Sequence, residues 1–205
     1  MLEPWLETTE SIARTAALGL GAWVALSGLS TWRKQLRGKT EYDHSRRLMR
    51  AVLETRDAVA IFRSPAISQG ETREALGEAG LDASSPNAAG IVRADGLVYQ
   101  RRWTRVAKAL SDLHVEVLEA EVLWKKEPRE AELKLLEGTQ ALWAAMVMCF
   151  SIRDPAGEKT QQQRLLEESW FQALNAGCAS PDAHGEAIEA AVRQFELLVQ
   201  PHLRL

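Results

Sequence analysis

Between Tyr99 and Trp124, apolar side chains recur at alternating steps of four and three residues, and this pattern constrains the fold more than any other. Such spacing places the side chains on one face of a helix. The face consists of Tyr99, Trp103, Val106, Leu110, Leu113, Val117, Ala120 and Trp124. A helix with so long an apolar stripe needs other helices to cover it, so we expect a bundle.

Other segments show the same helical spacing. One helix is expected before Pro65, a second between Pro128 and Pro155, a third over about 158–176, and a fourth after Pro181. Proline disfavours helical geometry in the residue before it but is tolerated in a first turn. The residues expected to be buried are Leu48, Val52, Thr55, Val59, Phe62, Leu133, Leu136, Trp143, Val147, Phe150, Ile188, Val192, Phe195 and Val199. Short turns between these helices predict an all-α fold with an antiparallel four- to five-helix bundle.

The connection at about 66–94 differs from its surroundings because glycine, serine and proline gather there, as in "DASSPNAAG". A short helix is possible within "ETREALGEAG". A connection this long in a compact domain is usually either functional or disordered, and we predict that it is mobile. Deleting part of "DASSPNAAG" should then cost almost no stability, since loop-closure entropy changes slowly with loop length.

The composition of the 205 residues excludes several classes of protein. The net charge of −3 shows no basic excess, so no nucleic-acid partner is expected. Two cysteines, Cys149 and Cys178, cannot build a disulfide framework, and no CxxC or Cys/His metal spacing exists. Cys149 lies in the apolar segment "MVMCFSI", where cysteine usually behaves as a small hydrophobic residue.

An uncharged run from Thr15 to Trp32 is the second strong feature of the sequence. As a helix it would be about 27 Å long, close to the roughly 30 Å of a bilayer core. Acidic residues precede the run and cations follow it, which by the positive-inside rule places the N-terminus outside. We predict a single-pass membrane protein with a short external N-terminus (1–11), a transmembrane anchor (12–32) and a cytoplasmic helical bundle (33–205).

Three other interpretations of this run remain open. Its glycines and serines make it only moderately hydrophobic, as in a buried helix of a soluble bundle. A cleaved signal peptide would have a cationic start, and a helix lying in the membrane interface would have a polar face. We adopt the anchor because the start is acidic and residues 15–29 lack a polar face.

Two partners follow from the anchor interpretation. The cations after the run are Arg33, Lys34, Arg37 and Lys39. They either contact anionic lipid head groups or only set the topology of the anchor. A face of small residues that favours pairing of two such helices consists of Ala13, Ala17, Gly21 and Ala25.

The segment "ALSGLSTWRKQLRGKTEYDHSRRLMRAVLETRDAVAIFRSP" resembles a group of small bacterial proteins, and "RRWTRV", "LEAEVLW" and "PHLRL" are similar to the same group. The resemblance covers most of the chain apart from the 66–94 connection. It implies a bacterial protein with an N-terminal membrane helix and a cytoplasmic helical domain, which places the predicted anchor in the bacterial inner membrane. It implies no activity, so no catalytic residue is carried over.

The best metal-ligand candidates are Glu41 and His44, which have the i, i+3 spacing used in carboxylate metal bundles. No second pair of this kind exists, because Asp112 and His114 are two residues apart and point in different directions. Acids of the 99–124 helix that could add oxygen ligands are Glu116, Glu119 and Glu121. The alternative is that Glu41 and His44 belong to a solvated helix face, and we assign no catalytic, cofactor-binding or metal residue.

These observations favour a non-enzymatic function. We expect the helical bundle to act as an interaction or scaffolding module with an unknown protein partner. The alternative is a metal-binding or enzymatic bundle that uses Glu41, His44 and acids of the 99–124 helix.

Overall fold

All the secondary structure in the described part of the chain is helical, which confirms the predicted class. The computed structural model describes residues 3–81, 87–125, 127–153, 160–175 and 182–203, without the side chains of 3–22, 24–26, 30–31, 34, 88 and 152. The helices are α1 (Glu3–Phe62), α2 (Gln69–Glu78), α3 (Ala88–Trp124), α4 (Glu127–Ile152), α5 (Gln161–Leu174), α6 (Ala183–Val199) and the short 3-10 helix η1 (Gln200–His202). Their contacts divide the chain into two units between Asp43 and His44, within α1.

The predicted transmembrane anchor at 12–32 is corrected by the structure. Among the residues described, no helix is long and apolar enough to cross a membrane. This finding contradicts the predicted single-pass localisation in the inner membrane with a cytoplasmic domain. The run also contains Gly19, Gly21, Ser27, Gly28 and Ser30, which add little to its hydropathy.

The first unit contains the cations that we predicted to contact lipid. Arg33 and Lys39 are exposed, and Arg37 Nε donates a hydrogen bond to Glu41 Oε1 at 2.8 Å. The side chain of Lys34 lies outside those described. The same holds for the small residues predicted to pair two helices, which are Ala13, Ala17, Gly21 and Ala25.

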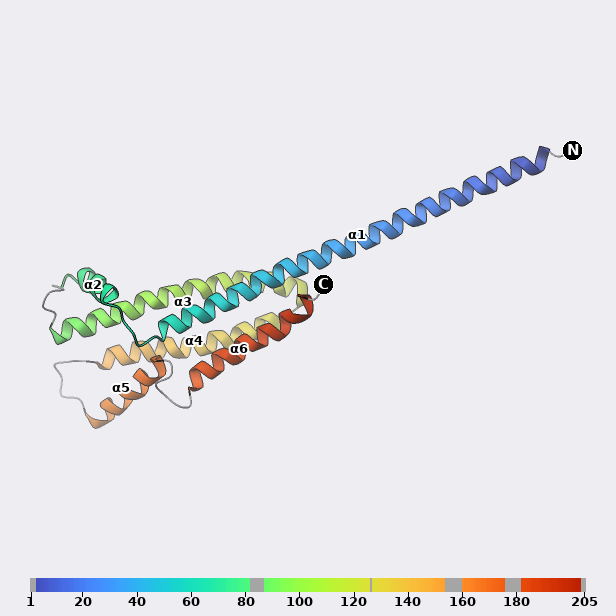
Figure 1. Cartoon of the computed structure of the whole chain (residues 1–205). Helices are drawn as coiled ribbons and strands as arrows, with labels where there is room; N and C mark the ends of the chain where they lie inside the picture. Colours follow the sequence, from blue (N-terminus) through green and yellow to red (C-terminus); the bar gives the residue numbers. More distant parts are fainter. Residues whose placement is uncertain (1–2, 82–86, 126, 154–159, 176–181, 204–205) are drawn as a thin grey trace. The chain divides into compact units, whose positions relative to one another are not determined.

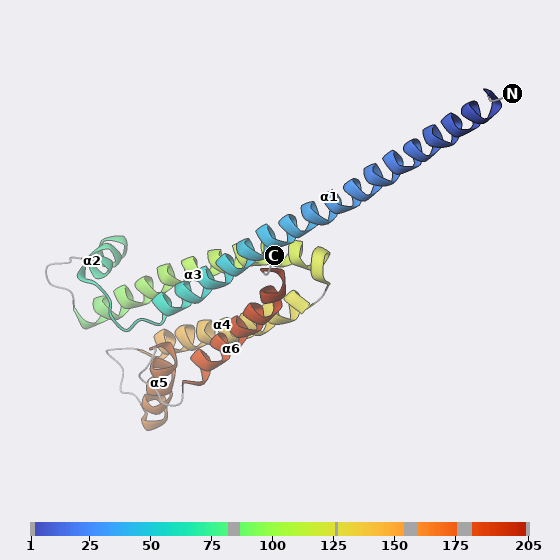
Figure 2. The ribbon, with the colours of Figure 1, turned by 45° about the vertical axis from the view of Figure 1, so that its right-hand side comes forward.

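The second unit is a helical bundle, and its core contains the predicted buried faces of α1, α3 and α6. Figure 1 shows α3, α4 and α6 side by side, and they stay together in the turned view of Figure 2. The fully buried side chains include Leu48, Val52, Thr55, Phe62, Val106, Leu113, Val117, Ala120 and Phe195. Thr55 is tolerated among them because its hydroxyl donates to the Ala51 carbonyl at 2.9 Å.

The predicted stripe of α4 is wrong in part. Leu133 and Val147 are exposed, while Leu135 and Leu142 are fully buried in their place. The prediction carried the register of α3 into the next helix. However, α3 ends at Lys125, whose φ of 70° is left-handed, and α4 therefore starts with a different face toward the core.

The 66–94 connection contains α2 and the first turns of α3. The capping box of Ser68 and Glu71 starts α2, which agrees with the short helix expected near "ETREALGEAG". Ala75 and Leu76 of α2 pack against Ala94 and Val98 of α3 in a small separate core. Figure 1 shows α2 beside the first part of α3. This segment therefore carries an element with its own buried face.

Arg102 of α3 holds the start of this connection in place. Its side chain is 5% exposed. The guanidinium donates to the carbonyl oxygens of Ser64 and Ala66 at 2.7 Å each, and to both carboxylate oxygens of Glu71 at 3.0 Å. The Arg102 hydrogen bonds to Glu71 hold the pKa of this carboxyl group at about 2, below its ordinary value of 4.5. The Ser68 backbone N–H also contributes to this shift.

Candidate functional site

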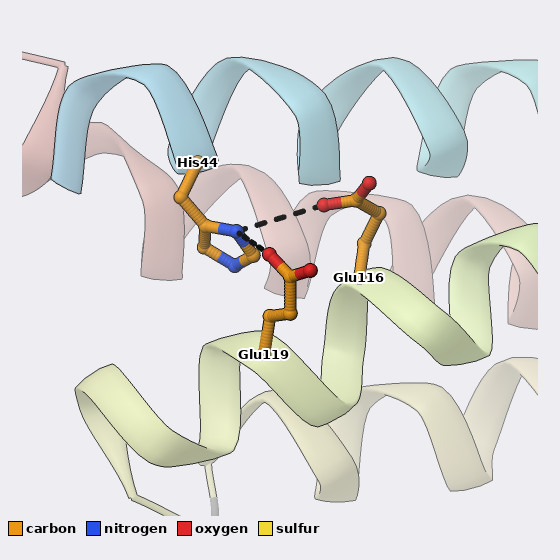
Figure 3. A group of neighbouring side chains, drawn as sticks. All are labelled: His44, Glu116 and Glu119. Atoms are coloured by element: carbon orange, nitrogen blue, oxygen red, sulfur yellow. Dashed lines mark ion pairs between the residues drawn. The ribbon is translucent and has the colours of Figure 1, made fainter. Parts of the chain in front are cut away.

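Helices α1 and α3 bring three potential metal ligands together, as Figure 3 shows. His44 lies one turn before Leu48, at the start of the buried face of α1. Glu116 and Glu119 lie at the edge of the buried face of α3, next to Val117 and Ala120. Because Glu116 and Glu119 are three residues apart, both carboxylates reach the same side of the helix.

The three ligand atoms are the Nδ1 of His44 and one oxygen of each carboxylate. His44 Nδ1 lies 3.3 Å from Glu119 Oε2 and 3.5 Å from Glu116 Oε2. All three atoms lie within 4.8 Å of one another. Two of the three side chains are thus acidic, and the group concentrates negative charge at one point of the bundle.

Arg47 supplies the positive charge at this point. Its Nη2 donates to Glu119 Oε2 at 2.6 Å and lies 3.3 Å from His44 Nδ1, while its Nε donates to Glu116 Oε2 at 3.3 Å. The hydrogen bond and charge of Glu116 raise the pKa of Arg47. The Arg47 side chain is 53% exposed, so water reaches the guanidinium.

The imidazole of His44 is buried and held by packing. The residue is 1% exposed, and burial lowers the pKa of the ring below its ordinary 6.5, although both glutamates oppose this shift. His44 is therefore neutral at pH 7. Trp124 packs edge-on against the ring with centroids 5.4 Å apart, and the buried Nε2 has no hydrogen-bond partner.

The cluster agrees only in part with the ligands expected from the sequence. His44, Glu116 and Glu119 come together, and the group contains neither Glu41 nor Glu121. Sequence reasoning missed Arg47. The available signal was its spacing, since a residue three positions after His44 lies on the same side of the helix.

A second charged cluster lies between α3 and α4. Glu132 is 1% exposed, and its Oε1 lies 2.8 Å from His114 Nδ1, while Arg129 Nη1 donates to its other oxygen. Arg129 Nη1 also lies 3.0 Å from His114 Nδ1. A buried carboxylate with two such partners is satisfied, so the cluster fixes how α4 packs on α3.

A third charged group joins α1 to α6. Arg63 at the end of α1 donates to both oxygens of Asp182 at 2.7 and 2.9 Å. Asp182 also caps α6 by accepting from the Gly185 backbone N–H at 3.0 Å. The Arg63 hydrogen bonds lower the pKa of Asp182.

Two adjoining cavities lie between α1 and α6 and share Arg193, and we call them together the α1–α6 groove. The first, of about 440 Å³, has six charged residues among the ten that line it, which are Arg56, Val59, Ala60, Arg63, Asp182, Gly185, Glu186, Ile188, Glu189 and Arg193. The second, of about 490 Å³, is mainly apolar and is lined by Met49, Leu53, Arg193, Glu196, Leu197, Val199, Gln200 and Leu203.

Comparisons with protein-family models, with curated proteins and with solved structures found no match to this chain. Conclusions about its function therefore depend on its own residues.

Proposed function

We propose that this protein is an interaction module whose α1–α6 groove receives an amphipathic helix of a protein partner. The observation that carries this proposal is the groove itself, which is lined by apolar side chains of α1, of α6 and of the segment after α6. Leu197 is 70% exposed within it and Leu203 is 38% exposed. Large exposed apolar side chains that line a groove are typical of sites where another protein binds.

The length and the lining of the groove fit a helix. Along α1 the lining runs from Met49 to Arg63, which corresponds to roughly 21 Å, or about four helical turns. The apolar end suits the anchors that an amphipathic helix presents at positions i, i+3, i+4 and i+7. The charged end offers Arg56 and Arg193 to acidic side chains of the partner and Glu189 to basic ones, which would set its direction.

The test uses photo-crosslinking in the native cell, with the full-length protein. A photoreactive residue at Leu197 is compared with one at Leu165, which is 61% exposed on α5 and does not line the groove. We expect an adduct from position 197 alone, with the crosslink in a helical segment of one protein. That segment, made as a peptide, should bind the purified protein and the L165E variant but not L197E.

Equal crosslinking from both positions would overturn the proposal. The same holds if the crosslinked segment binds L197E as well as it binds the natural protein. Because Leu197 is mostly exposed, L197E should keep the fold, which circular dichroism can check.

A further inference from the structure

We propose that His44, Glu116 and Glu119 form a zinc-binding site, and that the metal ion takes the place that the Arg47 guanidinium holds in this structure. The site shares no residue with the lining of the α1–α6 groove, so it is independent of the proposed docking function. Three features of the cluster support a metal site: the spacing of the ligand atoms, the cation already present and the kind of ligand atoms.

Two of the three distances between the ligand atoms match the edges of a tetrahedral metal site, and the third, between the two glutamate oxygens, is at most 4.8 Å. Zinc binds nitrogen and oxygen at about 2.0–2.2 Å, and a tetrahedron with such bonds has edges of about 3.3–3.6 Å. The two distances from His44 Nδ1 to the glutamate oxygens are 3.3 and 3.5 Å. Three protein ligands would leave the fourth position open for water, as in zinc sites that act on substrates.

Arg47 already shows that this position attracts a cation. One guanidinium contacts all three ligand atoms, at 2.6 Å to Glu119, 3.3 Å to Glu116 and 3.3 Å to His44. With Arg47 absent, two carboxylates and an imidazole would face one another without the guanidinium that now lies between them. Because the Arg47 side chain is half exposed, it can turn into solvent when a metal ion enters.

The ligand set selects the type of metal. One imidazole nitrogen with two carboxylate oxygens suits zinc and similar transition metals, whereas magnesium and calcium prefer sites made of oxygen alone. The ring of His44 needs a fixed orientation to serve as a ligand. In many metal sites a hydrogen bond to the second ring nitrogen provides it, and here the packing of Trp124 against the buried ring does so.

The test is calorimetric titration of the EDTA-treated full-length protein with zinc chloride. We expect one equivalent of zinc to bind. The variants E116Q and E119Q should each weaken this binding at least about tenfold, since each removes a ligand. E121Q, on the same helix but outside the group, is the matched control and should leave the affinity unchanged. Glu119 is 54% exposed, so E119Q should fold normally.

Arg47→Ala tests the resident-cation part of the proposal. This variant should bind zinc roughly tenfold more tightly, because the metal no longer displaces two ion pairs. Replacement of zinc by cobalt should give the visible spectrum of a tetrahedral site in the natural protein, and E116Q should lose it. Binding that E116Q and E119Q leave intact would overturn the proposal. The proposal would also fail if Arg47→Ala bound zinc and the natural protein did not. The guanidinium would then be the only cation that the natural site holds.

Discussion

Replacement of Arg102 by methionine should detach the 61–71 segment from the bundle, because this arginine joins α3 to the end of α1 and the start of α2. Methionine fills a similar volume but donates no hydrogen bond. The variant loses the bonds to the Ser64 and Ala66 carbonyls at 2.7 Å, a longer one to the Ile61 carbonyl at 3.3 Å, and the paired bonds to Glu71.

The magnitude follows from these contacts. A hydrogen bond from a charged donor contributes about 1.5–3 kcal/mol, and we count only the two short carbonyl bonds at the lower value. Glu71 is 35% exposed, so solvent screens its ion pair with Arg102, and we leave that pair out of this lower value. The free energy of unfolding should therefore fall by about 3 kcal/mol, a large part of the 5–15 kcal/mol typical of a domain.

Urea denaturation of the full-length protein, followed by circular dichroism and tryptophan fluorescence, measures this loss. The adjacent Arg101 is the matched control, since it also pairs with two glutamates of α2, Glu74 and Glu78, but lies at the surface. Arg101→Met should cost far less than Arg102→Met. If the two variants lose equal stability, or if Arg102→Met unfolds at the same urea concentration as the natural protein, the buried hydrogen bonds do not hold this connection.

Three further predictions follow from other contacts. Gly185→Ala should lower stability by about 1–3 kcal/mol in thermal melts despite alanine's better helix propensity, because the new Cβ would collide with Asp182 and lie 2.9 Å from Arg63 Nη1; unchanged melting would refute this. Glu71 has a folded pKa of about 2 against 4.5, so it contributes stability that is present above about pH 4.5 and lost as the pH falls toward 2. Urea midpoints between about pH 5 and 2 should show this loss, and the loss should be smaller in Arg102→Met, which keeps only the Ser68 contribution. Asn87→Ala should cost about 1 kcal/mol in urea unfolding, because its side chain caps α3 by accepting from the Gly90 N–H at 2.7 Å; deletions in "DASSPNAAG" should be neutral only if they spare it.

Helical periodicity predicted most of the core because a helix repeats its buried face every three to four residues, whatever lies opposite. The face from Leu48 to Phe62 is buried as expected, and the stripe of α3 is buried except at Trp103, Leu110 and Trp124, which are partly buried. The prediction failed where a turn intervened. Lys125 ends α3 with a left-handed backbone, and the rotation of the next helix depends on that turn, so Leu135 is buried in place of Leu133.

The sequence also identified His44, Glu116 and Glu119 as chemically suitable ligands, but only the tertiary structure determined that they meet. Residues on two helices come together only when the register between the helices is known, and local spacing carries no information about register. The same reason explains why Arg63 pairs with Asp182, 119 positions away, and not with the glutamates of α3. Local residue order thus determined the helices and most of their buried faces. Packing between helices decided which charges pair, because residues far apart in the sequence come close only in the folded chain.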